Sequence, residues 1–279
     1  MISNHLSHRR KTIQRLARDA LVAMTILAVL GLAFKEKWSV YSVRPDFVGE
    51  LLLAMHQFDL GTLLYLNHSI ESHPSLVKLV KFLGEHQVAR LPVHGTLIWL
   101  WLSTRDIERR CHILVGLLAT CFALAVSILC QHVLAVHIRP LLDQSIAVAN
   151  LTHWDLGQLG KRIYSFPSDT AVLYFGFAYV IFTINKIAGI ANYIWCLLTV
   201  GLCRVLLGIH YPSDILAGIF FPAMIVFLAS HLNFLRTAMV KAANAFDANG
   251  LIANTAFIFF MLEAYSLFPG IQSLLKAVT

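Results

Sequence analysis

The sequence contains few charged residues. Only 13% of its 279 residues are Asp, Glu, Lys or Arg, whereas 58% are hydrophobic, and the mean hydropathy is +0.69. Because a soluble domain carries about a quarter charged residues, this composition argues against a soluble enzyme and predicts an integral membrane protein. The net charge of +7 does not indicate nucleic-acid binding. Much of this charge lies beside apolar runs, where basic residues set membrane topology and meet anionic headgroups.

The cysteines show no metal-type spacing. We interpret them as small buried hydrophobic residues, because most of the five lie inside apolar segments: Cys111, Cys121, Cys130, Cys196 and Cys203. An A-x-A cleavage site is also missing after the first apolar run. We therefore expect that run to be a membrane anchor and not a removed signal peptide.

The apolar runs predict seven transmembrane helices, at about residues 19–34, 88–103, 112–136, 169–185, 187–208, 213–232 and 251–268. Several runs are shorter than the roughly 20 residues that cross a bilayer, so their ends are approximate. Residues 46–67 mix leucines with Asp, Glu and His, which favours an amphipathic helix at the membrane surface, with an eighth span as the alternative. Residues 234–247 are expected to form a second surface segment.

The distribution of Lys and Arg predicts the orientation of the chain. The segment HRRKTIQRLARD at the N-terminus and the loop TRDIERR at 104–110 are the densest basic stretches, so both are expected in the cytoplasm. Seven spans place them on the same side. The opposite, extracytoplasmic side then receives Arg139 and the segments 165–169 and 210–214. Five basic residues on that side oppose this assignment: Lys35, Lys37, Arg44, Lys161 and Arg162.

Polar residues gather at three of the predicted span ends, and the segment CRVLLGIHYPSD (203–214) holds the most. Arg204 lies within an apolar run, so it needs an anionic partner or a polar cavity. His210 and Asp214 are four residues apart around the start of a span. A carboxylate at this spacing fixes the tautomer of an imidazole and leaves its other nitrogen free to attack. The alternative is that His210 caps a span and Asp214 is a first-turn charge favoured by the helix dipole.

The segment QHVLAVHIRP (131–140) supplies a second arginine. Arg139 precedes a proline and suits bidentate binding of a phosphate, although a snorkelling arginine is the alternative. His132 lies seven residues earlier and would share its helical face. His137 does not share this face, so we interpret it as an interfacial histidine.

The segment SFPSDT (165–170) opens a predicted helix. The free N–H groups and the dipole of a helix N-terminus attract anions, so this segment predicts a phosphate cradle. Ser168 would either cap the helix or donate its hydroxyl to a phosphate oxygen. Two arginines, a helix N-terminus and an aspartate-oriented histidine at one membrane face together suit a phosphoryl group.

At these residues the sequence resembles the type 2 phosphatidic acid phosphatase (PAP2) superfamily, whose motifs are K-x6-RP, PSGH and SR-x5-H-x3-D. The third motif corresponds to Cys203-Arg204, five residues, His210, three residues and Asp214. The second corresponds to residues 167–170, and the first to His132, six residues and Arg139-Pro140. The resemblance covers about residues 88–232.

The resemblance implies an all-α membrane protein with a six-helix core, to which this chain adds a C-terminal span. We divide the chain into a cytoplasmic basic arm at 1–18, a PAP2-like transmembrane catalytic domain at 19–233, and a C-terminal surface segment with the extra span at 234–279. The resemblance also implies attack on phosphorus by His210, orientation of His210 by Asp214, and no metal or other cofactor. Arg139, Arg204 and Ser168 would hold the phosphoryl oxygens, with Asp169, Thr170 and His132 as further residues of the phosphate site.

Two departures from the family motifs affect the expected chemistry. His132 replaces the lysine of the first motif, and Thr170 replaces the histidine that protonates the leaving group. Phosphate leaves without a proton more readily than an alkoxide does, because its second proton dissociates at a pKa of about 6, whereas an alcohol, like water, holds its proton far more tightly. We therefore hypothesise a diphosphate substrate, such as a polyprenyl diphosphate lipid. His153, in the loop before the cradle, is a possible substitute acid.

The sequence thus predicts a lipid diphosphate phosphatase that acts through a phosphohistidine at the extracytoplasmic face of a bacterial inner membrane. One alternative is a phosphotransferase with a lipid or glycan acceptor. The other is an inactive protein that binds or transports lipid phosphates. The expected partners in each case are lipid phosphates and membrane lipids, and no nucleic acid.

Overall fold

The computed structural model describes residues 47–265, apart from residue 86, residues 134–136 and 153–162, and residue 249. These described residues contain helices and loops, with one isolated antiparallel bridge between Ile138 and Tyr164 and no strand. The prediction of an all-α fold is therefore confirmed. The predicted first span at 19–34 and the basic N-terminal arm lie outside the described residues.

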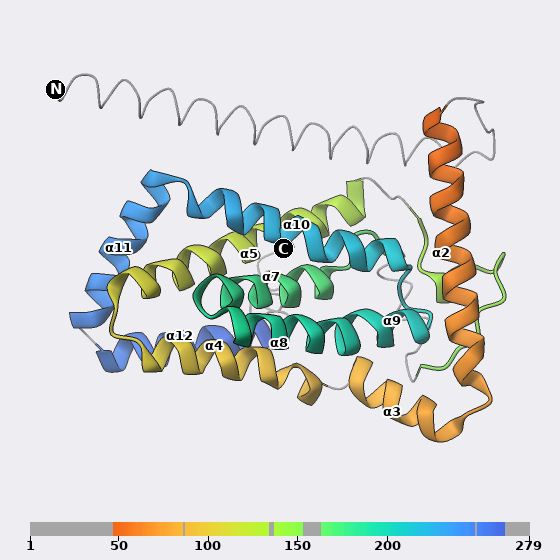
Figure 1. Ribbon diagram of the computed structural model, residues 1–279, viewed down its shortest axis with the longest axis horizontal. Helices are drawn as coiled ribbons and strands as arrows, with labels where there is room; N and C mark the ends of the chain where they lie inside the picture. Colours follow the sequence, from red (N-terminus) through yellow and green to blue (C-terminus); the bar gives the residue numbers. More distant parts are fainter. Residues whose placement is uncertain (1–46, 86, 134–136, 153–162, 249, 266–279) are drawn as a thin grey trace, which may run out of the picture.

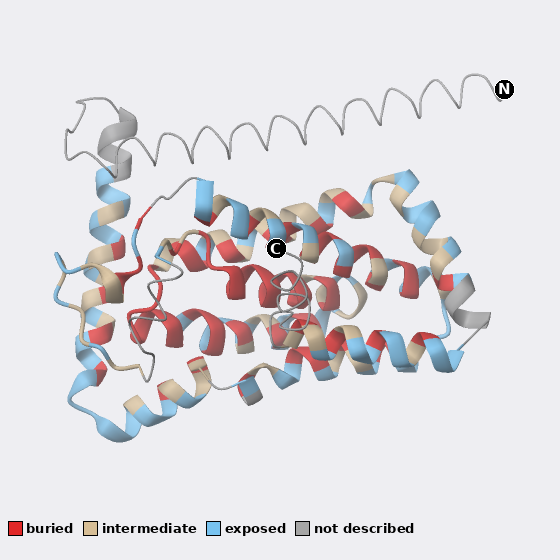
Figure 2. Ribbon diagram, turned by 180° about the vertical axis from the view of Figure 1, so that it is seen from behind, coloured by how far each residue is buried: buried red, intermediate tan, exposed pale blue. Residues whose placement is uncertain are grey.

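Four helices run side by side through the centre of the molecule (Figure 1). They are α5 (Ile107–Val133), α7 (Asp169–Ile184), α8 (Lys186–Cys196) and α10 (Pro212–Ser230). Helix α8 continues through a π-helical stretch, η4 (Leu197–Leu202), into the short α9 (Cys203–Leu206). Helix α7 packs against α5, α8 and α10 and is buried over most of its length, as Figure 2 shows.

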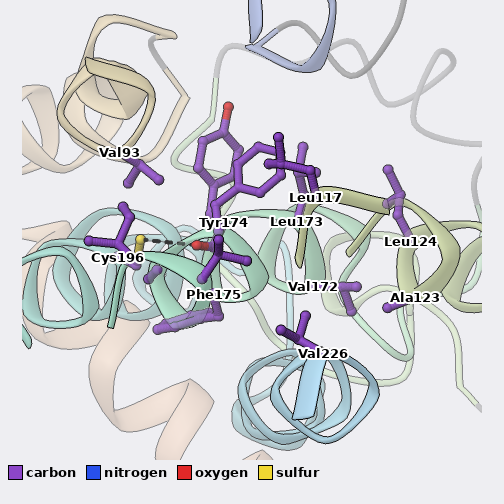
Figure 3. Packing of buried hydrophobic residues seen from close by; sticks show 14 of the residues in the cluster. Val93, Leu117, Ala123, Leu124, Val172, Leu173, Tyr174, Phe175, Cys196 and Val226 are labelled. Atoms are coloured by element: carbon purple, nitrogen blue, oxygen red, sulfur yellow. Dashed lines mark hydrogen bonds between the residues drawn. The ribbon is translucent and has the colours of Figure 1, made fainter. Parts of the chain in front are cut away.

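The core around α7 consists of interlocking apolar side chains (Figure 3). Val172 and Leu173 of α7 belong to the same buried cluster as Leu124 of α5 and Val226 of α10. Small residues let the helices approach closely, as they do in other membrane proteins. A Cβ atom at Gly218 of α10 would collide with Ala171 at the start of α7. The close contact between α7 and α10 therefore depends on Gly218, which lies against the residue that follows the segment 165–170.

Three of the described helical segments are long and apolar enough to cross a membrane: Ile107–Val133, Lys186–Leu206 and Pro212–Ser230. They coincide with the predicted spans at 112–136, 187–208 and 213–232. The predicted spans at 169–185 and 251–268 are apolar helices of 16 residues, α7 and α12 (Gly250–Tyr265). The predicted span at 88–103 is a short turn, η1 (Gln87–Arg90), followed by the 13-residue α4 (Leu91–Ser103). The chain is a membrane protein, and its total of seven spans stays a prediction.

The C-terminal helices pack on the central helices. Helix α11 (Asn233–Ala248) contacts α5, and α12 lies beside α4. The indole ring of Trp101 stacks on Phe257, with ring centroids 4.5 Å apart, and its Nε1 donates to Oδ1 of Asn254 at 3.0 Å. These contacts anchor α12 on α4.

Helix α2 (Phe47–Glu71) runs across one end of the central helices, and α3 (Pro74–Glu85) follows it (Figure 1). One stripe of α2 is buried at four positions: Asp59, Leu63, Asn67 and Ile70. The spacing of these residues is helical. Two of the four are polar, and both bond to the segments that form the candidate site described next.

Candidate active site

The structure brings the three polar segments together at the end of the bundle that α2 crosses. Nη1 of Arg139 lies 3.1 Å from Nε2 of His210, and Oγ of Ser168 lies 3.2 Å from the same nitrogen. All three side chains are buried. The sequence therefore identified three segments that meet in space, although 42 or more residues separate His210 from each partner.

A tight turn after α9 places His210 in front of α10. Gly208 adopts a φ of +72°, in the left-handed region that suits glycine, and a side chain there would collide with Val148. The chain then enters α10 at Pro212, a favourable residue for the first helical turn. Asp214 closes this turn, since its Oδ2 accepts a hydrogen bond from the backbone N–H of Tyr211 at 3.0 Å.

The contacts of His210 define its tautomer. A guanidinium group donates hydrogen bonds and cannot accept them, so Nε2 of His210 is the acceptor for Arg139. The single proton of a neutral imidazole is then on Nδ1, which donates to Oδ2 of Asp214 at 3.1 Å. Burial lowers the pKa of His210 well below its ordinary value, and the positive charges of Arg139 and Arg204 lower it further. The result is a neutral histidine with an unprotonated Nε2.

Ser168 connects the N-terminus of α7 to this histidine. Its Oγ accepts from the N–H of Ala171 at 3.4 Å, so it caps α7, and it also contacts Nε2 of His210. Its own N–H donates to the backbone carbonyl of Asp214 at 3.3 Å. Both roles predicted for Ser168 are thus compatible, because the hydroxyl caps the helix and faces the candidate nucleophile.

The carbonyl of Pro167 is held by two side chains of α5. Nε2 of Gln131 donates to it at 2.7 Å and Oγ of Ser127 at 3.4 Å. Sequence analysis did not identify either residue. Gln131 opens the segment 131–140, and its polarity at the end of an apolar span was the available signal.

The next two residues of α7 interact with each other. Oδ1 of Asp169 accepts from the backbone N–H of Thr170 at 2.7 Å and from its hydroxyl at 3.2 Å. Both side chains are buried. Arg204 is also buried and interacts electrostatically with Asp169 and Glu85. Asp169 and Glu85 are thus candidates for the anionic partner that a charge within an apolar run requires, with a polar cavity as the alternative.

The segment that contains this site is similar to a known protein family. Residues 116–238 match the PAP2 superfamily. We call this part of the chain the PAP2 domain, and it contains Arg139, the helix start at Ser168 and the pair His210 and Asp214.

Two curated bacterial proteins are similar to the chain. One is the "Bacitracin transport permease protein BcrC" of Bacillus licheniformis, which is 41% identical over 56 residues, or 19% of this chain and 26% of that protein. The other is the "Putative undecaprenyl-diphosphatase YbjG" of Escherichia coli (strain K12). It is 24% identical over 165 residues, which are 59% of this chain and 77% of that protein. No solved structure matches the chain.

The PAP2 domain departs from the sequence expectation at the end of α5. The described part of the helix ends at Val133, and Ile138 lies outside it, in an isolated bridge with Tyr164. The shared helical face predicted for His132 and Arg139 is therefore not formed. The side chain of His132 is exposed, and its Nδ1 lies 2.7 Å from the carbonyl of Ile128 in its own helix.

The interpretation of His137 as an interfacial histidine is wrong. Its side chain is 4% exposed, its Nε2 lies 3.3 Å from Oδ1 of Asp214, and its Nδ1 lies 2.8 Å from Oγ of Ser165. The error has the same cause, since helical spacing does not apply to an extended segment. His153, the predicted substitute acid, lies outside the described residues.

Helix α2 holds the PAP2 domain through two polar side chains that sequence analysis did not identify. Asp59 accepts from the N–H of Ser213 at 2.9 Å and from its hydroxyl at 2.5 Å. Nδ2 of Asn67 donates to the carbonyl of Leu206 at 2.9 Å. Burial raises the pKa of Asp59, and the bonds from Ser213 oppose this shift. The two contacts bind α2 to both sides of the turn that carries His210.

Proposed function

We propose that this protein is a lipid phosphatase that hydrolyses a polyprenyl diphosphate or a related lipid phosphate through a phosphohistidine at His210. One observation carries the proposal. His210 is buried and neutral, its Nδ1 donates to Asp214, and its Nε2 faces Arg139 and the N-terminus of α7. This arrangement combines an activated nucleophile with groups that bind an anion.

In the first step the phosphoryl group takes the contacts that Arg139 and Ser168 make with Nε2 of His210. The bond between Nε2 and phosphorus forms while the bond between phosphorus and the leaving oxygen breaks, and the electron pair stays on that oxygen. Arg139, Arg204 and Ser168 stabilise the charge on the phosphoryl oxygens. The imidazole becomes positively charged, and the carboxylate of Asp214 stabilises it through Nδ1.

In the second step a water molecule attacks the phosphohistidine. The bond between the water oxygen and phosphorus forms, the bond between phosphorus and Nε2 breaks, and the electron pair returns to the nitrogen. The product phosphate keeps the protons of the water. His210 is then neutral again, and Arg139 and Ser168 return to their contacts with it.

Asp169 and Thr170 support this site indirectly. A carboxylate repels a phosphate group, so Asp169 acts by orienting Arg204 and by accepting bonds from Thr170. The hydroxyl of Thr170 cannot replace the acid histidine, since it donates to Asp169 and titrates far above neutral pH. The substrate must then release a leaving group that needs no proton, which favours a diphosphate. The similarity to the putative undecaprenyl-diphosphatase of Escherichia coli supports the same class of substrate.

We further propose that the site opens to the extracytoplasmic side of a bacterial inner membrane. The two densest basic segments, at 8–19 and 104–110, support a cytoplasmic location for the other ends of the spans. Both curated relatives are bacterial proteins.

The test is to trap the intermediate on the purified protein. Prenyl diphosphate labelled with 32P at the terminal phosphate should label the wild type, and His210→Gln should abolish the label. Faster cleavage of phosphatidic acid than of prenyl diphosphate would contradict the proposed substrate class. Product formation that requires a lipid or glycan acceptor would indicate a phosphotransferase. Binding of the substrate without label or turnover would indicate an inactive lipid-phosphate-binding protein, as the replacements at 132 and 170 would allow.

A further inference from the structure

The carboxylate of Asp214 is shared by two histidines. Its Oδ2 lies 3.1 Å from Nδ1 of His210, and its Oδ1 lies 3.3 Å from Nε2 of His137. The side chains of Asp214 and His210 are fully buried, and that of His137 is 3% exposed. The PAP2 motifs account for His210 and Asp214, whereas His137 lies between the positions of the first motif and has no role in it. The second imidazole therefore needs its own explanation.

The surroundings of His137 hold its ring in one orientation. Tyr211 packs edge-on against it, with ring centroids 4.6 Å apart, and Phe166 does so at 6.0 Å. The backbone carbonyl of His137 accepts from the N–H of Ser165 at 3.2 Å, so the extended segment and the start of the cradle are bonded side by side. The hydroxyl of Ser165 lies 2.8 Å from Nδ1 of the ring. Both edges of the imidazole thus have polar partners.

These partners define the tautomer of His137. An ionised carboxylate only accepts hydrogen bonds, so the nitrogen that faces Oδ1 of Asp214 must carry the proton. The other nitrogen, Nδ1, is then an acceptor for the hydroxyl of Ser165. Burial lowers the pKa of His137 to about 3, with His56 contributing to the shift, which agrees with a neutral ring. His137 and His210 are thus both neutral rings with an N–H toward one carboxylate. Nδ1 of His210 bonds to Oδ2, whereas Nε2 of His137 contacts Oδ1, which has no hydrogen bond among the described residues.

We propose that His137 is a positioning residue for phosphoryl transfer, which orients the carboxylate of Asp214 toward His210 and is itself fixed by Ser165. The proposal rests on the proposed function. A ring N–H that faces each carboxylate oxygen opposes rotation of the group, so that Oδ2 stays on Nδ1 of His210. Nε2 of His210 then stays unprotonated and faces the phosphorus atom.

The proposal explains how the site keeps a reactive nucleophile without the usual lysine and second histidine. When His210 takes the phosphoryl group it becomes a cation, and only an ionised, aligned carboxylate stabilises it fully. Loss of the donor from His137 would leave Oδ1 of Asp214 in a buried position with one contact fewer, and this favours rotation or protonation of the carboxylate. Either change weakens the transition state more than the binding of the substrate.

The first experiment compares two substitutions of His137. His137→Phe keeps a ring against Tyr211 and Phe166 but removes the donor to Asp214. His137→Gln places an amide N–H near Oδ1 of Asp214 and its carbonyl near Ser165. We expect His137→Phe to lower kcat about 10- to 100-fold with KM nearly unchanged, as loss of an outer hydrogen-bonding partner does at other sites. His137→Gln should recover most of kcat.

The matched control is His231→Gln, at an exposed histidine beyond the C-terminus of α10. It should have wild-type kcat and KM. Wild-type kcat in His137→Phe would overturn the proposal. Equal losses in His137→Phe and His137→Gln, with equal losses of folded protein, would also overturn it, because they would indicate a packing role only.

A second measurement does not depend on turnover and separates this proposal from the proposed function. Protein labelled with 15N at the histidine rings gives nitrogen shifts that report the tautomer, and His210→Gln identifies the signals of His210. We expect a protonated Nδ1 and an unprotonated Nε2 in the wild type, and a mixture of tautomers in His137→Phe. Identical shifts in the two proteins would overturn the positioning role, even if the wild type hydrolyses no lipid phosphate.

Discussion

Nη1 of Arg139 lies 3.1 Å from Nε2 of His210, the nitrogen that we propose as the nucleophile. The contact keeps Nε2 as an acceptor and holds the proton on Nδ1. A phosphoryl group would offer the guanidinium a stronger, charged acceptor. In the proposed mechanism the guanidinium therefore moves from Nε2 to the phosphoryl oxygens when the substrate binds.

Arg139→Lys should lower kcat/KM roughly 10- to 100-fold, since a hydrogen bond to a charged group contributes about 1.5–3 kcal/mol. A lysine keeps the charge but loses the fork that contacts two oxygens. Steady-state kinetics with prenyl diphosphate measure the change. Inhibition by inorganic phosphate should weaken in parallel, and unchanged inhibition would show that Arg139 does not bind the phosphoryl group.

Asp214→Asn should lower kcat by about 10⁴-fold, the effect of a wrong histidine tautomer in a serine protease triad. The amide can donate to Nδ1 of His210, which would move the ring proton to Nε2 and block attack. Rates of labelling by 32P substrate measure the effect. Asp106→Asn, at an exposed residue before α5, is the control and should react like the wild type. Labelling of Asp214→Asn at the wild-type rate would contradict the role of the carboxylate.

The sequence was sufficient to predict the features that depend on local spacing. The proline at 212 and the serine at 168 mark helix starts, and four residues separate His210 from Asp214 across one of them. These patterns predicted where α7 and α10 begin, and they predicted the pair of His210 and Asp214. Apolar runs in the same way predicted the positions of the long helices.

Features that depend on where a helix ends, or on distant contacts, could not be predicted. The predicted shared face of His132 and Arg139, and the interpretation of His137, both assumed a helix that continues past Val133. The described helix ends at Val133. Asp59 bonds to Ser213, which is 154 residues away, and no spacing rule connects them. In α2, Asp59 and Asn67 share one helical face with the apolar residues Leu63 and Ile70. Their hydrogen-bond partners can be identified only from the packing of the folded chain.

Asp59→Ala should destabilise the protein and lower kcat. The carboxylate accepts two bonds from Ser213, and their loss leaves half-buried donors unpaired, which costs at most about 1–3 kcal/mol. Because Ser213 precedes Asp214, the substitution should also loosen the turn that carries His210. Thermal unfolding in detergent and steady-state kinetics measure the two effects. Gln57→Ala, at an exposed position of α2, should change neither. A wild-type melting temperature for Asp59→Ala would show that the contact does not hold α2.

The stability of the protein should fall as the pH falls below about 6.5, the ordinary pKa of histidine. His137 and His210 have lowered pKa values in the folded state, mainly because they are buried. At these two positions the unfolded chain therefore binds more protons than the folded protein below pH 6.5. Each histidine then costs up to about 1.4 kcal/mol per pH unit, and its contribution is fully present above pH 6.5, whereas Asp59, whose pKa is raised, acts in the opposite direction.

Melting temperatures between pH 7.5 and 4.5 test this dependence. His137→Gln removes one of the two groups, so it should roughly halve the decrease in the free energy of unfolding. His231→Gln, at an exposed histidine, should keep the wild-type slope. If the free energies of unfolding of the wild type and His137→Gln differ by the same amount at pH 7.5 and 4.5, a neutral, buried ring at 137 is contradicted.

Thr170→His should raise the cleavage of phosphatidic acid, because it restores a general acid next to the leaving group. Such an acid contributes about 10²- to 10⁴-fold where the leaving group needs a proton. A prenyl diphosphate releases prenyl phosphate as the leaving group, and this needs no proton, so its rate should change little. The ratio of the two values of kcat/KM measures the shift. Thr170→Asn, which is polar but transfers no proton, should leave this ratio unchanged even if both rates fall. If both variants change the ratio equally, or neither does, the missing histidine does not determine the choice between diphosphate and monophosphate lipids.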